Sequence, residues 1–217
     1  MSNIFDSIRL PDIKFFPDST AIILNEKNLT YSELDSLIDK VTYFLYQNGT
    51  KENDIVTLLF NNSLEFVITF LSLWEIGAVP VPLNTKLLEK DLHEQISFLN
   101  SDFTIKDKEF QNVSTPGKSF IISLDDLSEQ TEKFLYKKIP KDKTALILFT
   151  SGSSGKPKAV ILSFENLIQS ALIGNKVLNQ TKEDRWLASL PFYHIGGFSI
   201  IFRALMFGAS IIIPDSL

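Results

Sequence analysis

Residues 55–81 read IVTLLFNNSLEFVITFLSLWEIGAVPV, and this stretch decides the fold class. The apolar run 55–60 is typical of a buried strand. Residues 61–63 turn the chain and can cap a helix. Residues 64–76 are apolar nearly all round, which predicts a buried helix, and residues 78–81 predict a second strand. Because strand, helix and strand follow one another with short links, we expect a right-handed unit of two parallel strands.

The same alternation continues on both sides of this stretch. The expected helices are 31–45, 87–99, 163–178 and 200–207. The expected strands are 21–24, 28–31, 102–105, 119–123, 145–149, 159–162, 186–190 and 209–213. Because only residues 25–27 separate the first two, we expect them to form a short hairpin. This order predicts an α/β fold with mostly parallel sheets flanked by helices.

The composition narrows the classes of function. Of 217 residues, 44% are hydrophobic and 22% charged, which is typical of a folded globular protein and argues against disorder. The net charge of −5 and the lack of a basic stripe disfavour a nucleic-acid-binding protein. The sequence has no cysteine, which excludes a disulfide framework and a cysteine-based metal site.

We expect neither a secretion signal nor a membrane span. The first nine residues lack the apolar core of a signal peptide. The most apolar stretch, 198–213, contains Arg203 and Gly208 and is shorter than the roughly 18–20 residues that a spanning helix needs. With the absence of cysteine, these features predict a cytoplasmic protein.

A loop rich in serine and glycine follows the predicted strand 145–149. Its candidate phosphate-binding residues are Thr150, Ser151, Gly152, Ser153, Ser154, Gly155 and Lys158. We expect it at the carboxyl end of a parallel sheet, where ligands bind in open α/β folds. Its glycines let backbone N–H groups turn toward an anion, its hydroxyls add donors, and its lysine adds a cation, so the loop suits a polyphosphate. A flexible linker is the structural alternative.

The spacing in this loop excludes two common nucleotide sites. A P-loop needs glycine, four residues and then Gly-Lys-Ser/Thr, but Pro157 stands five residues after Gly152. No G-x-G-x-x-G follows a predicted strand, which disfavours a dinucleotide-binding site.

The loop sequence TSGSSGKPKA, residues 150–159, resembles the phosphate-binding signature of the adenylate-forming superfamily. This group contains acyl-CoA synthetases, luciferases and the adenylation domains of peptide synthetases. Ser154 replaces the usual threonine and Ala159 the usual glycine, and both keep the chemistry because the hydroxyl remains and Ala159 is small. The further segments that resemble the family's motifs, in the family's order, are 29–34, 74–84 and 191–197.

The resemblance implies a ligase reaction. Members join a small carboxylic acid to coenzyme A or a related acceptor. The carboxylate attacks the α-phosphorus of MgATP and releases pyrophosphate, and a thiol then attacks the acyl-adenylate and releases AMP. The implied ligands are therefore the acid, ATP with Mg²⁺, and coenzyme A. Residues 150–155 with Lys158 would stabilise the charge that develops on pyrophosphate.

The resemblance also implies that residues 1–217 form a partial N-terminal core domain. The family's magnesium-binding glutamate, ribose-binding aspartate and mobile C-terminal domain have no counterpart before Leu217. We therefore expect no metal ligand within this chain and expect the C-terminal portion of the same enzyme as its partner. We also expect no complete turnover by these residues alone.

His194 is the candidate catalytic residue, one of two histidines in the sequence. A lone histidine among apolar residues is more often structural. However, His194 lies in a predicted loop that resembles the family's fourth motif, where the corresponding residue lines the acyl and adenylate pocket. Gly196 and Gly197 of the same motif are further substrate-binding candidates. His93 lies in a polar helix and is expected at the surface.

Arg203 is a candidate for binding the substrate carboxylate. The simple alternative is an arginine that extends its charged end to water. A guanidinium pairs with a carboxylate through two parallel hydrogen bonds. Residues 189–203 resemble the o-succinylbenzoate–CoA ligases of the menaquinone pathway, whose substrate carries a second carboxylate.

Three classes of function remain open. The first is the N-terminal part of an AMP-forming acid–CoA ligase, with o-succinylbenzoate or a fatty or aryl acid as substrate. The second is a non-catalytic remnant that binds phosphate or nucleotide. The third is a structural protein that shares only the fold, which the set of motifs disfavours.

Overall fold

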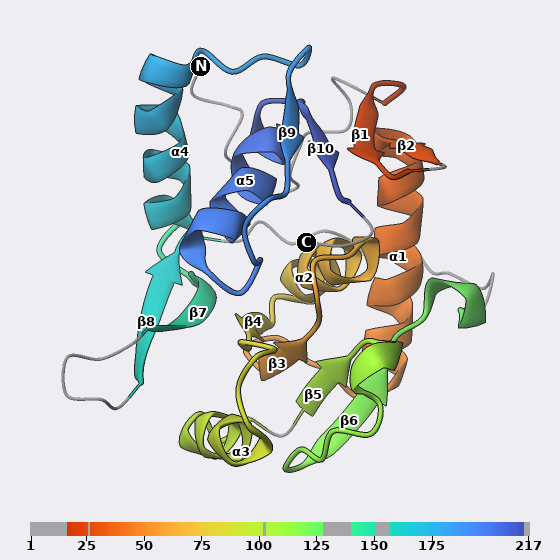
Figure 1. The fold of residues 1–217 in the computed structure, drawn as a ribbon, viewed down its shortest axis with the longest axis vertical. Helices are drawn as coiled ribbons and strands as arrows, with labels where there is room; N and C mark the ends of the chain where they lie inside the picture. Colours follow the sequence, from red (N-terminus) through yellow and green to blue (C-terminus); the bar gives the residue numbers. More distant parts are fainter. Residues whose placement is uncertain (1–16, 26, 102, 128–139, 151–156, 215–217) are drawn as a thin grey trace.

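Figure 1 shows a computed structural model that describes residues 17–25, 27–101, 103–127, 140–150 and 157–214. Its α-helices are α1 (Tyr31–Gln47), α2 (Leu64–Ile76), α3 (Glu89–Phe98), α4 (Phe164–Leu178) and α5 (Ile195–Met206). Its strands are β1 (Thr20–Ile23), β2 (Asn28–Thr30), β3 (Ile55–Leu59), β4 (Val79–Pro82), β5 (Phe103–Lys106), β6 (Lys118–Ile121), β7 (Thr144–Thr150), β8 (Lys158–Ser163), β9 (Arg185–Leu187) and β10 (Ser210–Ile212). The predicted α/β class is confirmed. None of the helices in the described ranges is long and apolar enough to cross a membrane.

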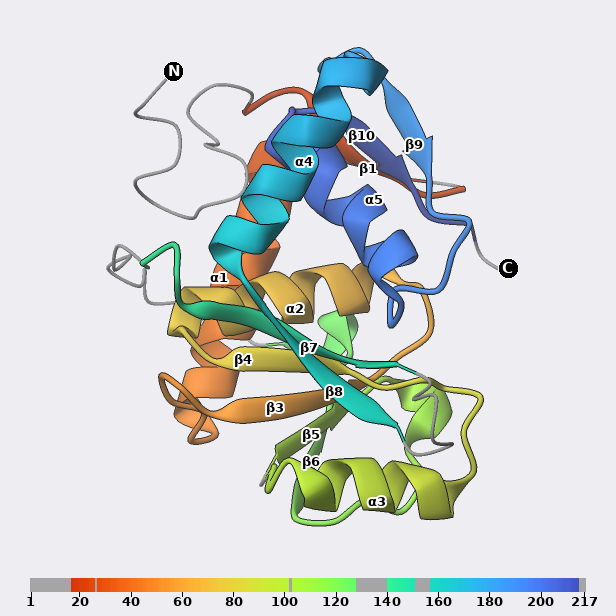
Figure 2. The ribbon, with the colours of Figure 1, turned by 90° about the vertical axis from the view of Figure 1, so that its left-hand side faces the viewer.

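One sheet is entirely parallel, with the strand order β4-β3-β5-β6. The buried face of α2 joins one hydrophobic cluster, whereas Leu92 and Ile96 of α3 join another with Val79 and Val81 of β4. The two helices therefore cover opposite faces of this sheet (Figure 2). The parallel unit predicted from residues 55–81 is confirmed as β3-α2-β4.

The other large sheet has the order β2-β1-β10-β9 and joins the two ends of the chain. β1 and β2 form the predicted antiparallel hairpin, while β10 lies parallel to both β1 and β9. The buried Tyr31 hydroxyl, at the start of α1, donates to the carbonyl of Ala209 at 2.7 Å. This bond holds α1 against the β10 end of the sheet.

β7 and β8 form a separate two-stranded antiparallel hairpin, in which Thr150 faces Lys158. The expectation that the Ser/Gly loop follows a parallel strand is therefore wrong. The physical reason is the length of the connection, because two strands joined by so few residues can pair only antiparallel. β7 nevertheless runs beside β4 of the parallel sheet (Figure 2).

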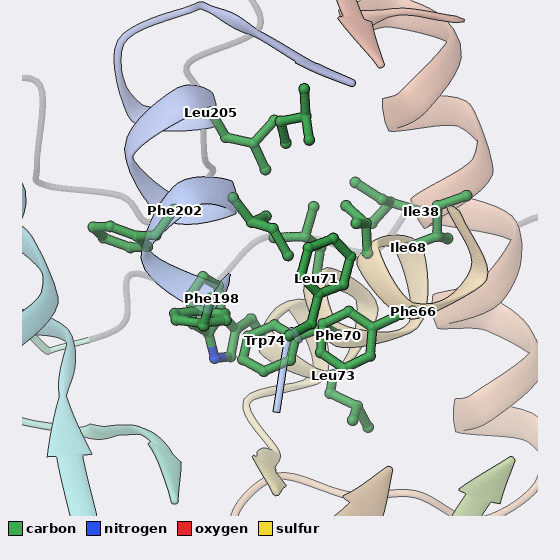
Figure 3. Packing of buried hydrophobic residues seen from close by; sticks show 14 of the residues in the cluster. Ile38, Phe66, Ile68, Phe70, Leu71, Leu73, Trp74, Phe198, Phe202 and Leu205 are labelled. Carbon is green, nitrogen blue, oxygen red and sulfur yellow. The ribbon is translucent and has the colours of Figure 1, made fainter. Parts of the chain in front are cut away.

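The core is built around the aromatic side chains of α2 (Figure 3). Phe70 lies 4.7 Å from Phe198 of α5, and Trp74 lies 4.8 Å from Phe164 of α4, between ring centroids. The indole Nε1 of Trp74 donates to the carbonyl of Ala145 at 2.6 Å. Because one helix contacts elements on all sides, α2 is buried all round, as its sequence predicts.

Several predicted boundaries differ from those of the structure, and β9 ends at Leu187 rather than at residue 190. α5 begins at Ile195 rather than at residue 200, so Gly196 and Gly197 lie in its first turn and not in a loop. β5 extends to Lys106, one residue beyond the predicted strand 102–105, and this lysine is only 4% exposed. The Lys106 ammonium donates to the carbonyl of Val113 at 3.0 Å, and burial lowers the pKa of this amine.

Candidate functional site

The described parallel strands of both large sheets end at one cleft of about 750 Å³. Loops that follow β3, β4, β5 and β6 line it from one side, and segments that follow β1, β9 and β10 line it from the other. β3 is the topological switch point of the parallel sheet. The chain continues from β3 to β4 on one side, and the next strand, β5, pairs with β3 on the other side. Ligands of open α/β sheets bind outside carboxyl ends at such a point. This cleft is the candidate functional site.

The loop from β9 to α5 brings the predicted histidine to the edge of the cleft. Tyr193 lines the cleft and is 8% exposed, and burial raises the pKa of its hydroxyl. The exposed His194 ring packs edge-on against Tyr193, with 4.5 Å between centroids. His194 is also the N-cap residue of α5, but its side chain makes no capping hydrogen bond. The imidazole therefore remains available to a ligand.

The two glycines of the fourth motif differ in their surroundings. A Cβ atom on Gly197 would lie 2.2 Å from the carbonyl oxygen of Pro191 and 2.5 Å from that of Leu190. A Cβ atom on Gly196 would meet only the Cδ1 end of the Leu190 side chain, at 3.1 Å. Gly197 therefore permits the close approach of α5 to the preceding loop, while Gly196 is exposed.

Arg203 lies in a smaller cavity of about 130 Å³ between α4 and α5. Ile195 and Ser199 of α5 and Asn166 of α4 are among the residues that line this cavity. The guanidinium carbon lies 5.7 Å from the centre of the Trp186 ring. Its Nε atom is buried without a hydrogen-bond partner, and no ion pair to Arg203 occurs among the described residues. A buried donor of this kind suits an anionic ligand.

Two of the phosphate-binding candidates, Thr150 and Lys158, lie at the end of the β7–β8 hairpin. Thr150 and Lys158 are exposed, and the Thr150 hydroxyl lies 3.5 Å from the Lys158 carbonyl. The candidates Ser151, Gly152, Ser153, Ser154 and Gly155 lie outside the described residues. The hairpin thus brings Thr150 and Lys158 together, but neither lines the Arg203 cavity. Among the described residues, no group of three or more His, Cys, Asp or Glu side chains could hold a metal ion.

Comparison with known proteins gives the family. The family described as AMP-binding enzyme matches residues 12–217, nearly the whole chain. The chain belongs to the AMP-binding enzyme family. The family resemblance inferred from the sequence motifs is thereby confirmed.

Individual relatives of this chain are named as CoA ligases. The chain is 32% identical over 197 residues to a 2-succinylbenzoate–CoA ligase of Bacillus mycoides (strain KBAB4), covering 91% of this chain and 40% of the relative. The o-succinylbenzoate coenzyme A synthetase (MenE) of Bacillus subtilis, solved in complex with AMP, superposes with a TM-score of 0.87 at 28% identity. That match covers 94% of this chain and 54% of the synthetase. The chain thus spans about half or less of the relatives it matches.

A solved structure other than the succinylbenzoate synthetases is also similar to this chain. The N-terminal subdomain of NpsA from Klebsiella oxytoca, in complex with 3-hydroxybenzoyl-AMSN, has a TM-score of 0.80 and 29% identity. It is matched over 93% of this chain and 51% of the neighbour. Proteins with this fold are therefore named with different acids, succinylbenzoate in one and a 3-hydroxybenzoyl group in the other.

The first two motifs that resemble the family, residues 29–34 and 74–84, have structural roles. Thr30 and Glu33 form a reciprocal capping box that begins α1. Trp74 bonds to Ala145, and Gly77 ends α2 in the left-handed conformation, with φ of 83°. These segments organise the core that carries the cleft.

Sequence reasoning missed Asn62 and Tyr193 as residues of the site. Both line the cleft. Asn62 could have been found, because it lies in the turn after a buried strand, and polar residues there meet the ligand edge of a parallel sheet. Tyr193 is adjacent to the predicted His194, but nothing in its spacing distinguishes it from a core aromatic residue.

Proposed function

We propose that this chain is the N-terminal part of an AMP-forming acid–CoA ligase and that its acid is 2-succinylbenzoate. Membership of the AMP-binding enzyme family supports the reaction class. The relatives named 2-succinylbenzoate–CoA ligase support the substrate. The single structural observation that carries the substrate proposal is the partly buried Arg203 in a cavity beside α5, because its Nε atom has no hydrogen-bond partner among the described residues.

The β7–β8 hairpin is proposed to hold the phosphates of ATP. Thr150 and Lys158 flank the Ser/Gly sequence, and their side chains are exposed to a ligand. A lysine and hydroxyl donors at the base of such a loop would stabilise the charge on departing pyrophosphate. Ser151, Gly152, Ser153, Ser154 and Gly155 are proposed to complete this site. Mg²⁺ would balance the phosphate charge when bound, through ligands outside this chain.

His194, Gly196 and Gly197 are proposed to border the acyl and adenylate group. The first N–H groups of a helix have no intrahelical partner, and they carry a partial positive charge. Because the His194 side chain does not cap α5, these N–H groups are open to an anionic oxygen. The imidazole can donate to the same oxygen when protonated on the facing nitrogen.

Arg203 is proposed to bind the carboxylate of 2-succinylbenzoate that does not react. The guanidinium is held by Trp186 on one side, which orients its planar donors. A charge-assisted hydrogen bond of this kind contributes about 1.5–3 kcal/mol, or roughly 10- to 150-fold in affinity. An acid without a second carboxylate gains nothing from it.

The test is an exchange assay on the gene product, expressed from its own start codon to its own stop codon. Incorporation of labelled pyrophosphate into ATP is measured with 2-succinylbenzoate, benzoate, 3-hydroxybenzoate and a fatty acid. We expect exchange that depends on 2-succinylbenzoate. Arg203→Ala should raise KM for this acid by roughly 10- to 100-fold and leave KM for ATP unchanged. Arg203→Lys should recover only part of the loss, because lysine lacks the planar fork.

Two other results would favour the remaining candidates. Preference for a benzoate would favour an aryl-acid ligase, a candidate supported by the similarity to NpsA with its 3-hydroxybenzoyl ligand. Binding of ATP without exchange for any acid would favour a non-catalytic nucleotide-binding protein. Coenzyme A as acceptor is tested separately by the formation of acyl-CoA.

A further inference from the structure

Asn62 lies in a turn that follows a strand of one large sheet, and its side chain bonds to the loop that follows a strand of the other. Its backbone lies in the turn between β3 and α2, directly before Ser63, whose side chain caps α2. Its side-chain Nδ2 donates to the carbonyls of Leu190 at 2.8 Å and Ala188 at 3.3 Å. Its Oδ1 accepts the backbone N–H of Phe192 at 2.8 Å. One amide group thus joins segments about 130 residues apart in the chain.

The loop that Asn62 holds has no regular secondary structure. It runs from the end of β9 to the start of α5, and it is bounded on the other side by Gly197 of α5. The ring of Phe192 packs 5.2 Å from Phe66 of α2, so the side chain and the backbone of Phe192 are both fixed by the β3–α2 unit. The next two residues along the chain are Tyr193 and His194.

We infer that Asn62 is a positioning residue, which sets the place of His194 at the ligand cleft through the backbone of residues 188–192. The inference rests on the proposed function for its catalytic consequence but not for its structural content. The amide satisfies a backbone donor and two backbone acceptors at once, which few side chains can do because both kinds of atom must lie on one planar group. Asn62→Ala removes all three bonds, while Asn62→Asp keeps the acceptor and loses the donor.

The structural arm of the test uses the two histidines as probes in the 217-residue chain. With histidine labelled with ¹³C at the ring Cε1 carbon, the spectrum has two ring signals to assign, one from His194 and one from His93, which is bonded to the carbonyl of Ser114. Asn62→Ala should shift or broaden the His194 signal and leave the His93 signal in place. Hydrogen exchange at the Phe192 amide should accelerate at least tenfold in Asn62→Ala and less in Asn62→Asp.

The matched control is Asn48→Ala. Asn48 also donates from Nδ2 to a backbone carbonyl, that of Phe44 at 2.8 Å, but at the C-terminal end of α1. This variant should leave both the His194 signal and the Phe192 exchange rate unchanged. If Asn62→Ala does not fold, Asn62→Asp provides the comparison, because it retains the bond to the Phe192 amide.

The kinetic arm uses the gene product described above. Asn62→Ala should lower kcat for acid-dependent exchange roughly 10- to 100-fold, while KM for ATP stays within about twofold, because the side-chain hydrogen bonds of Asn62 go to residues 188–192 and not to the described residues of the β7–β8 hairpin. Asn48→Ala should retain wild-type kcat. An unchanged His194 signal and Phe192 exchange rate would overturn the inference, as would an unchanged kcat. If the wild type shows no acid-dependent exchange, the proposed function fails, and the structural arm still decides whether Asn62 holds the loop.

Discussion

At the scale of single residues, the two tryptophans differ in one measurable way. The Trp74 indole donates to Ala145 at 2.6 Å in the core, whereas the buried Trp186 Nε1 has no hydrogen-bond partner in the described part of the chain. Trp74→Phe should therefore lower the free energy of unfolding by about 1–3 kcal/mol, because it leaves the Ala145 carbonyl unsatisfied. Trp186→Phe should lower it by less than about 1 kcal/mol. Urea unfolding followed by circular dichroism measures both, and equal losses would contradict the role given to the Trp74 bond.

The neighbouring glycines of α5 make a second residue-scale prediction. Gly197→Ala would place a methyl group against two backbone carbonyls, which cannot move aside without shifting the loop. We expect a loss of about 1–3 kcal/mol. Gly196→Ala meets only the end of a flexible leucine side chain, and alanine favours the helix by up to about 1 kcal/mol, so we expect no loss. The measurement is the melting temperature of each variant, and the prediction is wrong if Gly197→Ala and Gly196→Ala have the same melting temperature.

At the scale of elements, the capping box of α1 should depend on pH. The carboxylate of Glu33 accepts the backbone N–H of Thr30 at 2.7 Å, and this bond lowers the pKa of Glu33. A lowered pKa in the folded protein means stabilisation that is complete above the unfolded pKa of about 4.3 and is lost as the pH falls through the folded value. The difference in unfolding free energy between the wild type and Glu33→Gln should therefore be present at pH 7 and smaller at pH 3.

Thr30→Ala provides the control for this box. It removes the oxygen that accepts the Glu33 N–H, and N-cap substitutions of this kind cost about 0.5–2 kcal/mol. Because threonine does not titrate, most of that loss should persist at pH 3. If the unfolding free energies of the wild type and Glu33→Gln differ by the same amount at pH 7 and pH 3, the capping group is not an ionised carboxylate.

The elements that could be predicted are those with strong local patterns. The all-round apolar helix α2 and the hairpin of β1 and β2 follow from spacing alone, as does the parallel pair of β3 and β4. The start of α5 was missed because Gly196 and Gly197 are typical of a loop, whereas here one of them is required by helix packing. Lys106 was missed because its burial depends on the Val113 carbonyl, a contact that no periodicity encodes.

At the scale of the whole molecule, the site depends on how the two large sheets face each other. The motifs around Thr150 and His194 are local in sequence and could be found from it. The order of strands in the sheets and the bonds from Asn62 to the loop after β9 join distant residues, and a single sequence holds no pattern for such contacts. β7 and β8 pair antiparallel in a sheet of their own, so the candidates Thr150 and Lys158 lie in a hairpin and not at the predicted edge of a parallel sheet.

One face of α4 makes a prediction about association of the 217-residue chain. Ile173 and Val177 lie one turn apart on this helix and are 62% and 81% exposed. Exposed neighbouring apolar side chains favour contact with another surface, including a second copy of the chain. The double substitution Ile173→Lys with Val177→Lys should lower self-association in sedimentation velocity. It should change the free energy of unfolding by no more than about 0.5 kcal/mol, because neither side chain is in the core.

Leu88→Lys is the matched control for this surface. Leu88 is 75% exposed and precedes α3, at the opposite end of the molecule from α4 (Figure 2). It adds positive charge to the same acidic chain without touching the α4 face, so it separates a general effect of charge from a local effect of the surface. Self-association that falls equally in both variants, or in neither, would show that the α4 face does not drive it.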